Sequence, residues 1–183
     1  NSRVMLSIMG PTPKWMGGSA IDTAAEDEWV EMIASLVTYG LTTRGVQFGL
    51  LAPMNEPDWD GIEGPRVDQW QYTRLLRKLA DKLDAIGLPS LRLVGPDTAQ
   101  IGTGVNGYLP EMMTDAVVMS KVDHFAFHNY AGDSGGAASE IRSSAYPERN
   151  FWMTEVTNIW DIMAHLNQGP SAILVWDAYD SVY

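Results

Sequence analysis

Cysteine is absent from the sequence, so disulfide bonds, thiolate metal sites and a cysteine nucleophile are excluded. Positive charge is scarce: 12 Lys and Arg stand against 23 Asp and Glu, and the 183 residues carry a formal net charge of −11. A chain of this charge has little with which to neutralise phosphates. No apolar run approaches the roughly 20 residues that a bilayer-spanning helix needs. We therefore expect no nucleic-acid partner and no membrane span.

Motifs of nucleotide and acyl-transfer chemistry are missing as well. No Gly-x-Gly-x-x-Gly follows the first predicted strand, and the chain has neither a phosphate-binding loop nor a serine nucleophile elbow. A nucleotide-binding fold and a serine-triad hydrolase are therefore disfavoured. No repeat or low-complexity linker divides the chain, so we expect one domain over residues 1–183.

Short apolar runs alternate with helical patterns along the chain. The runs are typical of strands and cover residues 4–8, 46–51, 91–94, 124–128, 151–154 and 172–176. Helical spacing is clearest over 67–86 and over 22–39, where Asp22 is expected to cap the helix and Gly40 to end it. Weaker helices are predicted over 108–119, 139–143 and 159–166, and a glycine-rich loop over 131–137. The alternation predicts an α/β fold with a parallel sheet, either doubly wound or a (β/α)8 barrel.

Two carboxylates stand where predicted strands end. Glu56, in Asn55-Glu56-Pro57, comes after the second strand, and Glu155 comes directly after the fifth. Ligands of both candidate folds bind at the carboxyl ends of the strands, so we expect these side chains to converge. Two facing carboxylates are what a glycosidase needs, one to protonate the leaving oxygen and one to attack the sugar carbon or activate water. The structural alternatives are a helix-capping Glu56 and a Glu155 in a surface ion pair.

Aromatic residues are plentiful, with seven Trp and seven Tyr. Several follow predicted strands, among them Trp15, Trp59, Tyr130 and Trp176. Flat rings can stack on the C–H faces of sugars, although any one of them is equally compatible with ordinary packing. Their gathering at strand ends favours a sugar-binding cleft.

Taken together, these motifs resemble glycoside hydrolase clan A, whose members share a (β/α)8 barrel, and they are most similar to family 30 and its neighbours. Asn55-Glu56-Pro57 resembles the end of barrel strand four, and Trp152-Met153-Thr154-Glu155 resembles the end of strand seven. Four further segments, 11–16, 94–97, 127–130 and 174–176, are similar to the ends of strands three, five, six and eight. The resemblance covers nearly the whole chain.

Strands one and two of the barrel have no counterpart in this resemblance. The chain is therefore predicted to be a partial catalytic TIM barrel containing strands three to eight. The missing strands are expected from a longer parent chain or from another subunit. The resemblance also implies an extracellular or periplasmic location, a β-linked glycan as the partner, and no need for a cofactor or a metal.

The resemblance assigns a role to each candidate residue. Glu56 is implied to be the acid/base and Glu155 the nucleophile of a retaining β-glycoside hydrolase, with carboxyl groups roughly 5–5.5 Å apart. The implied substrate-binding residues are Asn55, His128, Tyr130, Trp176, Trp15 and Trp59. Asn55 would contact the sugar 2-hydroxyl, and Trp176 would form the floor of the −1 subsite. Asp97, in Gly95-Pro96-Asp97, is expected instead to bond backbone in a turn.

Three other functions stay open at the level of the sequence. The first is a non-catalytic, carbohydrate-binding barrel fragment that holds glycans with Trp15, Trp59 and Trp176. The second is a metal-dependent barrel hydrolase that uses Glu56, Glu155 and His128, although His124 is too far along the strand to share a metal with His128. The third is a transglycosylase that uses the same two glutamates.

Overall fold

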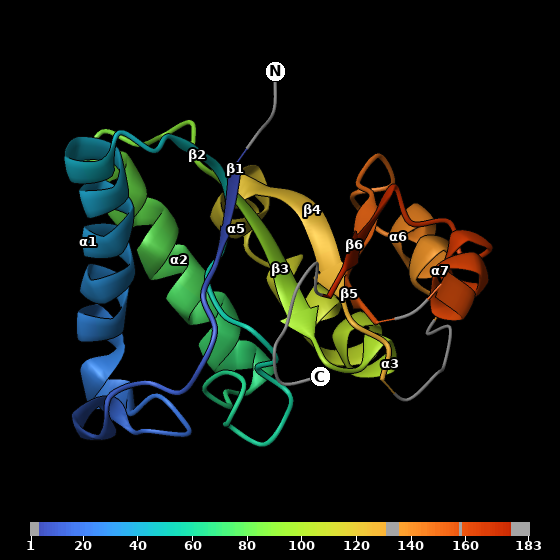
Figure 1. The fold of residues 1–183 in the computed structure, drawn as a ribbon, viewed down its shortest axis with the longest axis horizontal. Coiled ribbons are helices and arrows are strands. Elements are labelled where there is room, and N and C mark those ends of the chain that lie inside the picture. The colour runs from blue at the N-terminus through green and yellow to red at the C-terminus, as the bar shows by residue number, and fades with distance from the viewer. Residues whose placement is uncertain (1–3, 131–135, 158, 177–183) are drawn as a thin grey trace.

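A parallel β-sheet forms the centre of the protein (Figure 1). The structure is a computed structural model that describes residues 4–130, 136–157 and 159–176. The sheet has six strands in the order β1-β2-β3-β4-β5-β6, and every neighbouring pair is parallel. The strands are β1 Val4–Ser7, β2 Phe48–Ala52, β3 Arg92–Thr98, β4 Val122–Phe127, β5 Phe151–Val156 and β6 Ala172–Val175. Because spatial order follows sequence order, each connection crosses to the adjacent strand, as in a run of βαβ units.

The sheet curls into a half-barrel that does not close (Figure 1). β1 pairs with β2 and β6 pairs with β5, and the described residues contain no pairing between β1 and β6. Two free edges therefore remain where a closed barrel would have further strands. This confirms the predicted α/β fold, a partial (β/α)8 TIM barrel.

Helices cover the outer side of the sheet. They are α1 Glu26–Arg44, α2 Gln69–Ala85, α3 Ile101–Thr103, α4 Leu109–Met112, α5 Ala116–Lys121, α6 Ala137–Ser143 and α7 Ile159–Leu166. Short turns η1 Lys14–Met16 and η2 Thr23–Ala25 precede α1, and the π-helical η3 Gly104–Tyr108 precedes α4. In Figure 1, α1 and α2 lie side by side on one flank, while α6 and α7 lie at the other. Within the described residues, no helix has the length and apolar character to cross a membrane.

The first long helix differs from its prediction at both ends. Asp22 precedes η2 and its side chain makes no capping hydrogen bond, so the predicted cap is wrong. The helix passes Gly40 and ends at Gly45, whose φ of 67° is the left-handed conformation that commonly ends helices. Gly40 has a packing role instead, because a Cβ there would lie 2.5 Å from the ring of Phe48.

Two other elements also differ from expectation. β3 continues through Gly95 and Pro96, because it stays paired with β4 there while its recorded pairing with β2 stops at Leu93. Pro lacks an N–H and is tolerated where one side of a strand is unpaired. The predicted helix over 108–119 is split in two, since Asp115 caps α5 by accepting from the Val117 and Val118 N–H groups. Most of the predicted loop over 131–137 lies outside the described residues.

The apolar core has two parts, one on each face of the sheet. Leu51 and Leu93 belong to the large cluster that the sheet shares with the helices. Leu50 and Val94 belong to a small cluster with Ala52 and Ala126, packed by Met5 and Trp152. Successive side chains of a strand point to opposite faces, so the small cluster lines the concave side. It forms the inner packing beneath the carboxyl ends of the strands.

Candidate active site

Glu56 is held by backbone contacts just beyond the end of β2. Its φ is 43°, an uncommon left-handed conformation for a residue with a side chain. The Glu56 N–H donates to the Asp97 carbonyl oxygen at 2.9 Å, and the Glu56 carbonyl accepts from the Trp59 N–H at 3.0 Å. Glu56 is buried, with 4% of its surface exposed. The loop thus presents the carboxylate inward in a fixed conformation.

Asn55 and Asp58, close to Glu56 in the same loop, join this loop to neighbouring segments of the chain. The Asn55 N–H donates to Ile8 O at 3.0 Å, and Asn55 Nδ2 donates to Glu63 O at 3.4 Å. On the other side, the Asp58 carboxylate accepts from the Ala99 and Gln100 N–H groups at 2.8 and 3.2 Å. Burial raises the pKa of Asp58, although these backbone donors oppose the rise. Asn55 therefore helps to hold the loop, and its predicted sugar contact stays a prediction.

Glu155 lies within β5 near its carboxyl end, because the strand runs to Val156, two residues beyond its predicted end at Thr154. Tyr130 Oη donates to Glu155 Oε1 at 2.7 Å. Burial raises the pKa of Glu155, and the charge of His128 and the Tyr130 hydrogen bond only partly offset this rise. The Glu155 side chain is about 10% exposed, so part of it reaches the surface.

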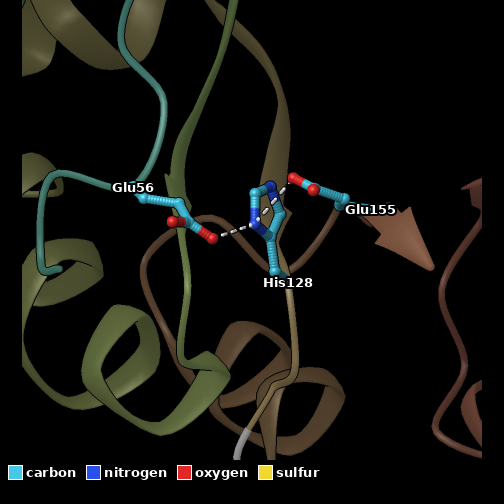
Figure 2. A group of neighbouring side chains, drawn as sticks. All are labelled: Glu56, His128 and Glu155. Carbon is cyan, nitrogen blue, oxygen red and sulfur yellow. Dashed lines mark hydrogen bonds and ion pairs between the residues drawn. The ribbon is translucent and has the colours of Figure 1, made fainter. Parts of the chain in front are cut away.

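His128 lies between the two glutamates (Figure 2). Its Nδ1 is 2.9 Å from Glu56 Oε1 and 3.1 Å from Glu155 Oε2, and its Nε2 is 3.5 Å from Asp97 Oδ1. The side chain is 1% exposed. Burial acts to lower the pKa of His128, but the polar contacts with the Asp97 and Glu56 carboxylates and the charges of Asp97 and Glu155 outweigh it and raise the pKa to about 10.

The three side chains form one compact group. One carboxylate oxygen from each glutamate and one His128 nitrogen all lie within 4.8 Å of one another. Such a group could hold a metal ion, the rival that the sequence left open. Here the shared Nδ1 contacts both glutamates directly at hydrogen-bond distances. Ligand atoms about 2.9–3.1 Å apart are also what a metal ion bonded to each at roughly 2.0–2.2 Å would produce, so the metal candidate stays open.

The predicted aromatic residues are distributed unevenly around this group. Tyr130 bonds Glu155 and meets the His128 ring edge-on, with ring centroids 5.9 Å apart. Trp59 is tied to Glu56 through its backbone, and its side chain is exposed. Trp15 in η1 and Trp176 after β6 are exposed as well, and the Trp176 N–H donates to Val156 O at 2.9 Å. The sugar-stacking roles of the three tryptophans stay predictions.

Sequence reasoning missed Thr154 and gave Asp97 only a turn role. Asp97 is not simply a turn residue, because its carboxylate accepts a hydrogen bond from the Thr154 hydroxyl of β5 and faces His128. Both residues occupy carboxyl ends of strands, as Glu56 and Glu155 do. That shared position was the signal available in the sequence, and the expected turn at Gly95-Pro96 obscured it.

Comparison with known proteins bears on the fold. No family model matches the sequence, and no curated protein matches it. Among solved structures, SrfJ from Salmonella typhimurium matches with a TM-score of 0.75 and 18% identity, covering 95% of this chain and 44% of that one. An endo-β1,6-glucanase matches with a TM-score of 0.77 and 17% identity, covering 96% and 45%. A family 30 endoxylanase from Clostridium papyrosolvens matches with a TM-score of 0.64 and 16% identity. That match covers 87% of this chain and 42% of the endoxylanase chain.

These likenesses show that the fold is like that of the matched glycoside hydrolase structures. They agree with the resemblance of the strand-end motifs. The chain spans less than half the length of each of these three proteins. Six of the eight strands that such a barrel requires are present in the described residues.

Proposed function

We propose that this chain contains the catalytic pair of a retaining β-glycoside hydrolase, with Glu56 as the acid/base and Glu155 as the nucleophile. The observation that carries the proposal is the approach of a buried carboxylate, Glu56, and a partly buried one, Glu155, with oxygens within 4.8 Å, at the carboxyl ends of β2 and β5. Retaining glycosidases keep their carboxyl groups roughly 5–5.5 Å apart, whereas inverting enzymes leave roughly 6.5–9.5 Å for a water. Facing oxygens this close are compatible with the shorter, retaining separation, and we propose double displacement on that ground.

The reaction proceeds in two balanced steps. Glu155 attacks the anomeric carbon while the bond to the leaving oxygen breaks and that oxygen takes a proton from Glu56. In the second step the Glu56 carboxylate takes a proton from water, whose oxygen attacks the same carbon and releases Glu155. No metal or cofactor takes part. With a sugar hydroxyl in place of water, the same steps give a transglycosylase.

The surroundings of Glu155 support its role as the nucleophile. A nucleophilic carboxylate has to be ionised, and burial opposes this by raising the pKa of Glu155. Two groups favour the ionised form, the charged His128 ring and the Tyr130 hydroxyl.

The substrate and the complete protein are part of the same proposal. A β-linked glycan fits both the paired carboxylates and the names of two structural neighbours, an endo-β1,6-glucanase and an endoxylanase. The two free sheet edges favour closure by strands from a longer parent chain or from another subunit. We place such an enzyme outside the cytoplasm, in the extracellular or periplasmic space.

Intact-mass spectrometry after incubation with a panel of 2-fluoro glycosides tests the proposal. A single added sugar, mapped by peptide analysis to Glu155, is the expected result, and Glu155→Gln is the matched control that should stay unlabelled. A folded chain that remains unlabelled, both alone and with the missing strands restored, would contradict the catalytic proposal. Glycan binding by that unlabelled protein would favour the non-catalytic, carbohydrate-binding fragment.

The metal-dependent hydrolase is the second candidate, favoured by the convergence of Glu56, His128 and Glu155. It predicts loss of glycan hydrolysis on dialysis against a chelator and recovery on addition of a divalent cation. The retaining mechanism predicts the same rate before and after chelation. Measuring both on one preparation separates the two candidates.

A further inference from the structure

We infer that Asp97 is a positioning residue of this site. It holds the His128 ring with Nδ1 directed at Glu56 and Glu155, and its backbone holds Glu56. The inference rests on the function proposed above for the two glutamates. It assigns a role to a residue that the reaction steps do not use.

The backbone of Asp97 fixes the loop that carries the acid/base. Asp97 lies in β3, is 3% exposed, and has a φ of 60°. Asp is among the few residues with a side chain that tolerate this left-handed conformation. In this conformation its carbonyl oxygen accepts the N–H of Glu56 at 2.9 Å. This hydrogen bond joins the loop after β2 to β3 at Glu56.

The side chain of Asp97 reaches the opposite part of the site. Its Oδ1 accepts a hydrogen bond from Thr154 Oγ1 on β5, and that hydroxyl also lies 3.3 Å from Phe127 O. The same Oδ1 is 3.5 Å from His128 Nε2, an ion-pair distance rather than a short hydrogen bond. Thr154 thus fixes the carboxylate beside the ring, and the ring is braced from the side opposite the glutamates.

Acceptors at both ring nitrogens favour a doubly protonated His128. A neutral imidazole has one N–H, whereas the cation has two. The groups that face the ring are Glu56 from the β2 loop, Asp97 from β3, Glu155 from β5, and Tyr130 from the segment after β4. In the described residues, no Lys or Arg makes an ion pair with any of these carboxylates. His128 is therefore the positive charge of the group, and Asp97 fixes the proton on Nε2.

The test is a pH titration of the ring nitrogens by NMR on the chain labelled with 15N-histidine. The His128 signals are assigned by their loss in a His128→Asn chain. In the wild type, both ring nitrogens should remain protonated well above pH 7, because the pKa of His128 is raised to about 10. Asp97→Asn should lower the titration midpoint by roughly 1–3 pH units, the usual effect of removing a nearby opposite charge.

Asp58→Asn is the matched control, since it neutralises a neighbouring carboxylate that bonds Ala99 and Gln100 and makes no contact with His128. Its midpoint should stay within about 0.3 pH unit of the wild type. An Asp97→Asn midpoint equal to that of the control would overturn the inference. So would a wild-type His128 that loses its proton below about pH 7, near its ordinary pKa.

Thr154→Val provides a second route if Asp97→Asn does not fold. It keeps the charge of Asp97 but removes the hydroxyl that fixes the carboxylate, so the midpoint should fall by about half a pH unit. An unchanged midpoint would contradict the positioning role. The titration needs no turnover, so it separates this inference from the glycosidase proposal: failed labelling by 2-fluoro glycosides with the expected titration would refute only the catalytic assignment.

Discussion

The two flanks of the half-barrel cover one sheet with very different packing. α1 and α2 are 19 and 17 residues long, and α2 buries Leu75, Leu76, Leu79 and Leu83 almost completely. α6 and α7 have seven and eight residues. In α7, Trp160, Met163 and Leu166 are 80%, 58% and 53% exposed.

The two glutamates of the candidate site lie beside different flanks. Glu56 follows β2, whose outer face is packed by the long helices, whereas Glu155 lies in β5 beside the short ones. His128 and Asp97 come from the strands between them and contact both sides. The dense flank therefore fixes Glu56, while the position of Glu155 depends on the contacts that cross from β3 and β4.

The largest expected effect is a loss of turnover, and it should differ between variants of the two glutamates. Glu155→Ala should lower turnover by at least about 10⁴-fold on every substrate, because no covalent intermediate can form. Glu56→Ala should cost roughly 10²–10⁴-fold with a poor leaving group and much less with a dinitrophenyl glycoside, which needs no protonation. Initial rates on both substrates, measured on the form of the protein that takes up 2-fluoro glycosides, check this. Equal losses for the two variants on the activated substrate would contradict the assignment.

A stability contrast tests the packing of the flanks directly. Leu79→Ala in α2 removes a side chain with no exposure and should lower the free energy of unfolding by about 2–5 kcal/mol. Leu166→Ala in α7 removes one that is 53% exposed and should change it by less than about 0.5 kcal/mol. Urea denaturation of both variants provides the comparison. Similar losses would show that the α7 flank is packed in solution.

The contact between α1 and α2 should make the dense flank sensitive to acid. Glu26 is buried and bonds the Arg74 guanidinium, which holds the pKa of Glu26 below its ordinary 4.5. The unfolded chain therefore binds this proton first as the pH falls. The stabilisation is present above pH 4.5 and is lost as the pH drops through the lower folded value. Glu26→Gln should flatten this part of a plot of unfolding free energy against pH, whereas Glu28→Gln, an exposed neighbour in the same turn, should not.

The smallest effect concerns Tyr130, which links the segment after β4 to Glu155. Its hydroxyl donates to the ionised form of Glu155, so Tyr130→Phe should raise the pKa of Glu155 further. The acid limb of the kcat/KM profile should then move up by as much as about one pH unit, with little loss above the limb. A profile that falls uniformly at all pH values would indicate a substrate contact instead.

Much of the fold was predictable, because its signals are local. The apolar runs located all six strands, and the leucine spacing of α2 located the best-packed helix to within two residues. The end of α1 was not predictable, because Gly40 is accommodated against Phe48, a contact made only in the folded chain. The predicted third strand ends before β3 does, because a proline such as Pro96 normally ends a strand. Whether a strand can accommodate this proline depends on how far the neighbouring strand β2 stays paired beside it.

The sequence pointed to residues of the candidate site but not to the contacts between them. Glu56 and Glu155 are 99 positions apart in the sequence, and the strand-end rule together with the clan A resemblance pointed to both. The sequence could not indicate that His128 lies between them, or that Asp97 and Thr154 brace its ring. Those contacts depend on the curvature of the sheet and on two left-handed residues, Glu56 and Asp97, that do not have the usual glycine signal.

Gly64 restricts how the rim of this site could be redesigned. A Cβ at this position would lie 1.7 Å from the Asn55 carbonyl oxygen, and one at Gly61 would lie 2.4 Å from Ser19 O. Between them, Ile62 is 65% exposed and Glu63 is exposed as well. A mutant library aimed at new glycan preferences can therefore vary positions 62 and 63 freely, provided that both flanking glycines are left untouched.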